Sequence, residues 1–256
     1  MVRGLKIFAD YFTGYEDRYV LIGGAACDIW LSKAEFRARA TKDLDLVLVI
    51  EAIDSAFVAH FWDFVREGGY KRSEVSSGHR RCYRFAKPTH EEFPFMIELF
   101  SRQIGLLEQG LPGSIIPVVT ESSLSALSAI MLDDAVYRFI LESRRKEAGL
   151  MVLDHGGLIP LKAAAYVDLK ARRARGERID ADDIAKHRND VLRLSVLLSE
   201  TDTIDVPSIL LISLRELITD LEAEKPDWLA LRKSLGFPAP LNGDQLIALI
   251  RKVYGL

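Results

Sequence analysis

The sequence predicts an α/β sheet domain followed by a bundle of helices. Up to about residue 102, short apolar runs rich in β-branched or aromatic residues alternate with an amphipathic helical pattern and with glycine turns. Beyond about residue 157, the pattern is helical throughout. A chain of 256 residues can form one large domain or two small ones. We place the sheet domain at residues 1–156 and the helical domain at residues 157–256.

The elements of the first domain follow from local patterns. Apolar runs predict strands at residues 19–22, 43–50, 81–85 and 95–100, with one or two more within residues 115–130. Between the first two strands, Gly23 and Gly24 predict a turn that leads into a helix from residue 25. Residues 53–67 form an amphipathic helix.

The helices of the second domain are marked by their ends. Pro160 suits the first turn of a helix over residues 158–175, which Gly176 ends. Asp180 can cap a second helix that runs to about residue 198. Three more helices are separated by Pro207, Pro226 and Gly243.

Two carboxylates stand at the start of the second strand. Asp43 and Asp45 are one residue apart, so in a strand both side chains point to the same face. Like charges there repel unless a cation lies between them. Magnesium suits such a pair, because it takes one or two carboxylates and completes its coordination with water and phosphate oxygens. The alternative for an isolated Asp-x-Asp is a hydrated strand end.

Two further features support a functional interpretation. Glycines at Gly23 and Gly24 let a backbone approach a ligand, and the helix that follows offers free N–H groups to an anion, although such a pair is often only a turn. Glu98 is the single acid of an apolar strand. Because an unpaired buried carboxylate is costly, Glu98 either reaches water or faces a metal ion or a base.

In this order, the glycine turn, the Asp-x-Asp strand and the strand with a single acid resemble the nucleotidyltransferase superfamily, whose best-known member is DNA polymerase β. The resemblance falls on Gly23, Gly24, Asp43, Asp45 and Glu98. It implies an α/β (α+β) fold in which a mixed sheet with flanking helices precedes the helical bundle.

A narrower resemblance links the chain to the abortive-infection nucleotidyltransferases, the toxins of type IV toxin–antitoxin pairs. It rests on Arg39-x-Thr41-x-Asp43-Leu-Asp45 after the glycines. Those toxins also carry a lysine on a C-terminal helix and then a Lys-Asp-x-x-Asp-Leu motif, and Lys162 and residues 186–191 lie at the matching places.

Three positions depart from the pattern of these families. Ala25 stands where a serine or threonine often follows the glycines, which removes one possible phosphate ligand. The gap between Gly24 and Asp43 is longer than usual, so the intervening loop must bulge. His187 replaces the first acid of the second motif.

The resemblance implies a metal-dependent transfer of a nucleoside monophosphate from a nucleoside triphosphate. Asp43 and Asp45 would hold two magnesium ions, and Glu98 would bind the second ion or take the proton of the acceptor hydroxyl. The acceptor would be RNA, notably a tRNA end, or a protein, and an antitoxin would be a partner. The residues expected to bind the nucleotide are Gly23, Gly24, Arg39, Thr41, Lys162 and Asp190.

Lys162 is expected in the first turn of its helix, where the helix dipole disfavours a cation. A triphosphate held there would remove that penalty. The alternative is that its long side chain reaches water. Asp190 is expected to orient Lys162 or the nucleotide.

Two other functions remain open at this stage. A small-molecule transferase of the aminoglycoside-modifying kind would share the same metal site. A catalytically silent module that senses a nucleotide or binds a partner would keep the fold, but the presence of all three acids counts against it.

Composition is that of an ordinary globular protein, with 49% hydrophobic and 28% charged residues and a formal net charge of −3. That charge argues against a general nucleic-acid coat but allows local basic patches. Cys27 and Cys82 have no zinc-site or disulfide spacing. This cysteine usage makes a reducing cytoplasm the expected location. No apolar run is long enough for a membrane helix, so we expect no membrane partner. The candidate RNA contacts are Lys170, Arg172, Arg173 and Arg175, with a second basic patch at residues 79–81.

Overall fold

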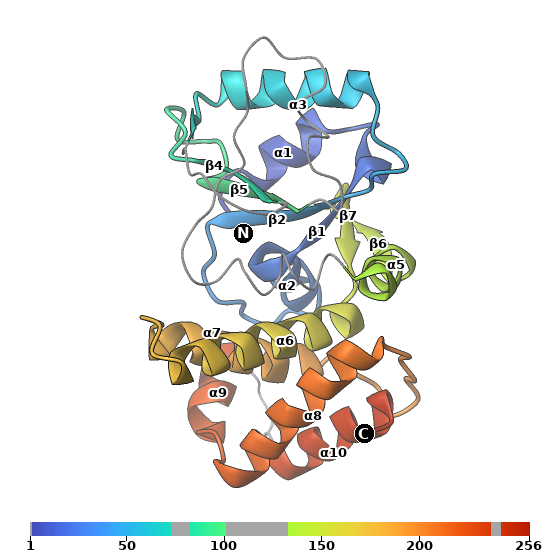
Figure 1. Cartoon of the computed structure of the whole chain (residues 1–256), viewed down its shortest axis with the longest axis vertical. Coiled ribbons are helices and arrows are strands. Elements are labelled where there is room, and N and C mark those ends of the chain that lie inside the picture. The colour runs from blue at the N-terminus through green and yellow to red at the C-terminus, as the bar shows by residue number, and fades with distance from the viewer. Residues whose placement is uncertain (1, 73–81, 101–132, 237–241) are drawn as a thin grey trace.

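The computed structural model describes residues 2–72, 82–100, 133–236 and 242–256. A layer of strands lies between helices, and a bundle of helices packs against one side of this α/β unit (Figure 1). The predicted fold class is therefore confirmed. The strands expected within residues 115–130 and the basic patch at residues 79–81 lie outside the described residues.

The described strands form one mixed sheet in the order β3-β4-β5-β2-β1-β7-β6. Strand β2 pairs in parallel with β5 and antiparallel with β1, and β1 pairs in parallel with β7. This places the expected Asp-x-Asp strand and the strand of Glu98 side by side in the centre of the sheet. The strands are β1 (Tyr19–Ile22), β2 (Asp43–Leu48), β3 (Lys71–Arg72), β4 (Cys82–Ala86), β5 (Met96–Phe100), β6 (Arg144–Glu147) and β7 (Leu150–Leu153).

Helices cover both faces of the sheet. On one face lie α1 (Leu5–Tyr11) and α3 (Ser55–Glu67), and on the other lies α2 (Gly23–Lys33), between the sheet and the bundle (Figure 1). Helix α5 (Asp134–Glu142) lies beside β6 and β7 (Figure 1). The first face is sealed by buried aromatic rings, among them Phe8, Phe12, Phe57, Phe61 and Phe64. Burial of such large apolar side chains is the main term that fixes helices on a sheet.

The C-terminal bundle consists of α6 (His155–Ala174), α7 (Ala181–Ser195), α8 (Ser208–Ala223), α9 (Trp228–Leu235) and α10 (Gly243–Tyr254). Helices α7, α8, α9 and α10 begin at or just after the positions predicted from the sequence, which are Asp180, Pro207, Pro226 and Gly243. Helix α6 packs against α7 and α8 and also against α2, so it joins the bundle to the sheet domain.

Two predicted helix starts are wrong. Helix α6 begins at His155 rather than 158, because Asp154 accepts a hydrogen bond from Gly157 N and caps it. Pro160 and Lys162 therefore lie beyond the first turn, and the dipole argument for Lys162 no longer holds. Proline cannot donate to the carbonyl of Gly156, and Tyr254 Oη donates to that oxygen instead at 2.7 Å.

The second wrong prediction is the start of helix α2, at the pair Gly23 and Gly24. Helix α2 begins at Gly23 itself, directly after β1, so the pair forms the first residues of the helix instead of a separate turn. Gly23 has φ +71°, a value that glycine adopts without strain. The chain therefore passes from strand to helix in one residue, which brings the N-terminus of α2 against the end of β2.

No helix or strand is predicted from the sequence for residues 133–153, where the structure has α5 and the hairpin of β6 and β7. The hairpin turn places Ala148 at φ 52° and Gly149 at φ 77°. The usual sequence signal of such a turn is Asn-Gly or Asp-Gly. Here the turn residues are Ala148 and Gly149, so that signal is absent. Leu150, Val152 and Leu153 are buried because β7 extends the sheet beside β1.

Candidate functional site

A pocket of about 810 Å³, counted out to open solvent, lies between the ends of β2 and β5, the start of α2, and the facing sides of α6 and α7. Of the residues proposed from the sequence as catalytic or nucleotide-binding, all but Asp190 line it, and Asp190 contacts Lys162 directly. The lining residues are Ile22, Gly23, Gly24, Arg39, Thr41, Asp43, Asp45, Arg84, Met96, Glu98, Leu158, Leu161, Lys162, Ala165, Lys186 and His187.

Three carboxyl groups meet at one side of this pocket. Asp43 and Asp45 lie on the same face of β2, and Glu98 is the register partner of Asp45 on β5. Burial raises the pKa of both aspartates. Burial and then the charge of Asp45 raise the pKa of Glu98 to about 8, so near neutrality Glu98 keeps its proton and donates a hydrogen bond to Asp45.

Glu98 also has a cationic partner that sequence reasoning did not name. Arg84 on β4 is its register partner on the other side, and Arg84 Nε donates to Glu98 Oε1 at 2.5 Å. The expectation that Glu98 faces a metal ion or a base is thus met in part by the guanidinium. Only the antiparallel register of β4 and β5 pairs these two residues, and that register is not visible in the sequence.

The glycines are required by what lies next to them. A Cβ at Gly23 would come within 1.8 Å of Asp45 Oδ2, and a Cβ at Gly24 within 2.7 Å of Thr41 Oγ1 and 3.1 Å of Arg39 Nη2. The absence of side chains here lets the start of α2 approach the acids and the 39–41 loop. The free N–H groups of the helix start then lie at the pocket, as an anion site requires.

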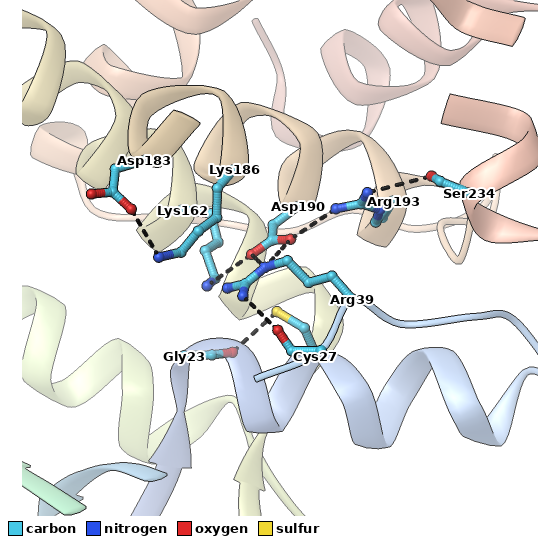
Figure 2. A network of polar contacts seen from close by, with 10 residues as sticks. Gly23, Cys27, Arg39, Lys162, Asp183, Lys186, Asp190, Arg193 and Ser234 are labelled. Atoms are coloured by element: carbon cyan, nitrogen blue, oxygen red, sulfur yellow. Dashed lines mark hydrogen bonds and ion pairs between the residues drawn. The ribbon is translucent and has the colours of Figure 1, made fainter. Parts of the chain in front are cut away.

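An ion network centred on the buried carboxylate of Asp190 joins α7 to α6 and to the loop before β2. Asp190 on α7 lies between three cations, and Figure 2 shows them converging on its carboxylate. Lys162 Nζ is 3.2 Å from Oδ2, Arg39 Nε lies 3.0 Å from Oδ1 and 3.1 Å from Oδ2, and Arg193 Nη1 is 3.3 Å from Oδ1. Lys162 is only 6% exposed and Asp190 only 2%. The alternative prediction, that the side chain of Lys162 reaches bulk water, is therefore wrong.

The network fixes the charge state of Asp190. Burial alone would raise the pKa of this carboxyl, but Lys162 and Arg39 outweigh burial and lower the pKa to about 2. Asp190 therefore remains ionised and holds Lys162 from α6 and Arg39 from the loop before β2 at the pocket. Asp190 thus contacts Lys162, the residue that the sequence predicts it to orient.

Lys186 and His187 lie on α7 in the turn before Asp190. Lys186 pairs with Asp183 at 3.3 Å and not with Asp190 four residues on. His187 lines the pocket, and its Nδ1 is buried with no hydrogen-bond partner in the described part of the chain. Burial and then the charge of Lys162 lower the pKa of His187 to about 3, so its ring is neutral.

The described residues contain no group of three or more histidine, cysteine, aspartate or glutamate side chains arranged as metal ligands. A magnesium ion that also binds a triphosphate needs only one or two carboxylates. Asp43 and Asp45 provide that pair, and their raised pKa values indicate buried negative charge that a cation would compensate. The donor set thus fits magnesium at the two aspartates.

The candidate RNA contacts lie away from this pocket, near the C-terminal end of α6. Arg172 is only 8% exposed and bonds Glu177 through Nε at 2.7 Å, while Lys170 pairs with Asp220. Arg175 lies 3.4 Å from Glu177, and Arg173 is exposed. Arg172 therefore has a structural part, and the accessible charge of this patch is smaller than the sequence indicates.

No family model matches the chain, and no curated protein matches it. Among solved structures, the crystal structure of an antigenic nucleotidyltransferase-like protein from Paracoccidioides brasiliensis is similar, with a TM-score of 0.45 and 15% identity. The alignment covers 90% of this chain and 90% of that chain. In the part of the chain that the structure describes, no helix has the length and apolar character needed to span a membrane.

Proposed function

We propose that the protein is a metal-dependent nucleotidyltransferase that moves a nucleoside monophosphate from a nucleoside triphosphate to an acceptor. One observation carries the proposal: Asp43, Asp45 and Glu98 face the same pocket as the start of α2 and the cations Lys162 and Arg39. Acids that suit magnesium and cations that suit phosphate are therefore within one site.

In the proposed reaction, the acceptor oxygen bonds to the α-phosphorus, the bond from that phosphorus to the β-phosphate oxygen breaks, and pyrophosphate leaves. Magnesium at Asp43 and Asp45 would neutralise charge on the triphosphate. Glu98 would lose its proton when positive charge is added beside Asp45, because a nearby cation favours the carboxylate. It would then bind the second ion or accept the proton of the acceptor hydroxyl.

The phosphates would be held by the start of α2, which lies next to the acids, and by the cations of the pocket. The N–H groups at the start of α2 would bind phosphate oxygens at Gly23 and Gly24, and the Thr41 hydroxyl lies beside them. Lys162 and Arg39 would stabilise the charge that develops on the leaving pyrophosphate. Asp190 would keep both cations in place through the contacts it already makes.

For the acceptor we propose RNA, in particular tRNA, or a protein, with the enzyme acting as the toxin of a type IV toxin–antitoxin pair. The support is the sequence resemblance of the Arg39-x-Thr41-x-Asp43 segment, together with Lys162 and Asp190, to those toxins. The contact of Arg39 and Lys162 with one carboxylate ties these separate motifs to a single site. An antitoxin protein would then be a partner.

The test is incubation with each labelled nucleoside triphosphate, magnesium and, in parallel, total RNA, a protein extract or an aminoglycoside. We expect label on RNA or protein, lost on chelation of magnesium and absent with Asp45→Asn. Label on the aminoglycoside alone would identify the small-molecule alternative. Nucleotide binding without any transfer would identify the catalytically silent alternative and refute the enzyme.

A further inference from the structure

Two cations of the pocket have no part in the proposed reaction. Arg84 on β4 and Lys186 on α7 line the pocket together with the acids. A ligand can reach both, because the side chain of Lys186 is 40% exposed and that of Arg84 is 19% exposed. A third cation, Lys42, is exposed at the start of β2, and its Nζ lies 5.7 Å from the centre of the Phe95 ring, directly before β5.

The sheet places Arg84 on the other flank of the acids from the start of α2. In the strand order β4-β5-β2-β1, the two strands that carry the acids lie between Arg84 on β4 and Gly23, where β1 passes into α2. Neighbouring strands are spaced by about 4.8 Å, so these two residues stand about 14 Å apart across the sheet. A single phosphate group bound at the start of α2 therefore does not reach Arg84.

The charges that act on the two aspartates divide in the same way. Burial raises the pKa of both. Lys186 and then Arg84 do most to lower the pKa of Asp43. For Asp45, the charge that does most to lower the pKa is that of Lys162. The pocket thus holds one cation that acts mainly beside Asp45 and a separate pair that acts mainly beside Asp43.

We infer that Lys42, Arg84 and Lys186 form the acceptor side of the site and bind a phosphodiester of an RNA strand beside its attacking hydroxyl. This inference rests on the proposed function, because it names the acceptor class of the same reaction. In phosphoryl transfer, the attacking and leaving oxygens lie roughly in line with the phosphorus between them. Pyrophosphate that leaves toward Lys162 and the start of α2 therefore requires an acceptor that enters from the side of Arg84.

The partners that these cations have in the protein leave them able to bind an anion. Lys186 pairs with Asp183 at 3.3 Å, a contact drawn in Figure 2, and both side chains are exposed. Exposed pairs of this kind contribute little free energy, so a phosphate can replace the carboxylate. A guanidinium has five N–H donors, and the contact of Arg84 with Glu98 engages those of Nε and Nη2.

The charge of this side favours RNA over the other acceptors. A phosphodiester beside the attacking hydroxyl would make charge-assisted contacts with the three cations. An aminoglycoside carries several ammonium groups, which the same cations would repel. The acids that could attract those ammonium groups are neutralised by magnesium in the proposed reaction. A protein hydroxyl brings no negative charge of its own to the site.

The experiment measures transfer from a labelled nucleoside triphosphate to tRNA, to a dinucleoside monophosphate and to the free nucleoside that carries the same hydroxyl. Wild type is compared with Lys42→Gln, Lys186→Gln, the double variant and Lys186→Arg. Arg84 is left in place because it also pairs with Glu98. The control is Lys252→Gln on α10, another exposed lysine with a carboxylate partner at 3.3 Å.

We expect each change to glutamine to raise KM for tRNA and for the dinucleoside monophosphate about tenfold, the effect of one charge-assisted contact, with little change in kcat. Lys186→Arg should keep a KM close to that of the wild type, and the free nucleoside should be a poor acceptor throughout. The slope of log tRNA affinity against log salt should fall by about 0.7 for each lysine replaced. Nucleoside triphosphate affinity, measured by calorimetry with magnesium, should stay unchanged, and Lys252→Gln should match the wild type.

Several results would overturn the inference. An unchanged KM for RNA in the double variant would remove both lysines from the acceptor side and leave the proposed function intact. An equal loss of nucleoside triphosphate affinity would assign them to the triphosphate instead. Equal KM values of the wild type for the dinucleoside monophosphate and the free nucleoside would exclude a phosphodiester contact, and label on a protein or an aminoglycoside instead of RNA would exclude this acceptor class. A wild type that binds no nucleoside triphosphate would refute the proposed function and this inference together.

Discussion

Asp45 and Glu98 are register partners on the parallel strands β2 and β5, and Glu98 donates a hydrogen bond to Asp45 at the pocket. Side chains of paired residues on neighbouring strands point to the same face of a sheet. Asp45 and Glu98 therefore both face the pocket. Arg84 from β4 compensates part of their charge through Glu98. Asp43 forms no ion pair with any residue that the structure describes, and burial raises its pKa.

Replacing Asp43 or Asp45 by asparagine should abolish transfer while the fold survives. Without metal, the free energy of unfolding should stay equal or rise by up to about 1 kcal/mol, because buried like charge is removed. Urea unfolding in the presence of a chelator, together with the labelled-nucleotide assay, measures both effects. Asp205→Asn, at an exposed position, is the matched control and should change neither. Most of the activity surviving in either variant would refute the metal assignment.

Alanine at Gly23 should be more harmful than alanine at another glycine with positive φ. At Gly23 the added Cβ meets Asp45 Oδ2 at 1.8 Å, whereas at Gly14, with φ +89°, it meets nothing within 4 Å. Gly14→Ala should therefore cost only the backbone strain of about 1 kcal/mol, and Gly23→Ala should cost more and also weaken magnesium-dependent nucleotide binding. Denaturant unfolding and calorimetry distinguish the two variants. Equal stability losses with unchanged binding would show that the approach to Asp45 does not matter.

Lys162→Ala should weaken triphosphate binding by about 1–3 kcal/mol, the cost of one charge-assisted contact. The control is Lys170→Ala, two turns further along α6, where the side chain is exposed and pairs with Asp220 at the surface. Lys170→Ala should leave the affinity unchanged. Calorimetry with tripolyphosphate and with a nucleoside triphosphate measures both variants. Equal affinities for wild type and Lys162→Ala would leave Lys162 with a purely structural part in the ion network.

Asp190→Asn should destabilise the protein by about 2–4 kcal/mol, because it leaves the buried Lys162 and the partly buried Arg39 without their carboxylate. The native pKa of about 2 lies below the ordinary 3.8, so this stabilisation is complete above about pH 4 and is lost as the pH falls toward 2. The stability gap between wild type and Asp190→Asn should narrow over that range. Unfolding curves at several pH values measure this gap. The control is Asp244→Asn, at the exposed partner of Lys225, which should lower the free energy of unfolding by less than about 1 kcal/mol. A gap that does not change with pH would contradict the assignment.

Neutralising Arg173 and Arg175 together should weaken tRNA binding and flatten its salt dependence, if the patch at the end of α6 contacts RNA. Each lost phosphate contact should reduce the slope of log affinity against log salt by about 0.7–0.9. Arg172 is left in place because it is held by Glu177, and its loss would confuse stability with binding. Filter binding at two salt concentrations measures the slope, with Arg66→Gln on the distant helix α3 as the control. Identical slopes for wild type and the double variant would exclude the patch and favour a protein or small-molecule acceptor.

The sequence by itself determined the order of elements around the site and the chemistry of its main groups. Alternation over residues 43–48 placed Asp43 and Asp45 on one face, and Asp180 and Gly243 marked where α7 and α10 begin. These features depend on neighbours within a few residues, which the sequence displays directly. The starts of α2 and α6 were predicted wrongly. Helix α2 begins at Gly23 because of its backbone geometry, and α6 begins after the single cap at Asp154.

Only the tertiary structure decided which distant residues meet. The register of β4, β5 and β2 brings Arg84, Glu98 and Asp45 together, and the packing of α6 and α7 on the sheet domain brings Lys162 and Asp190 to Arg39. The tertiary structure also buries Arg172, which the sequence analysis had counted among the candidate RNA contacts. Charge, burial and pKa at such points depend on side chains that are far apart in the chain. Local pattern sets the elements, and the free energy of packing them sets the site.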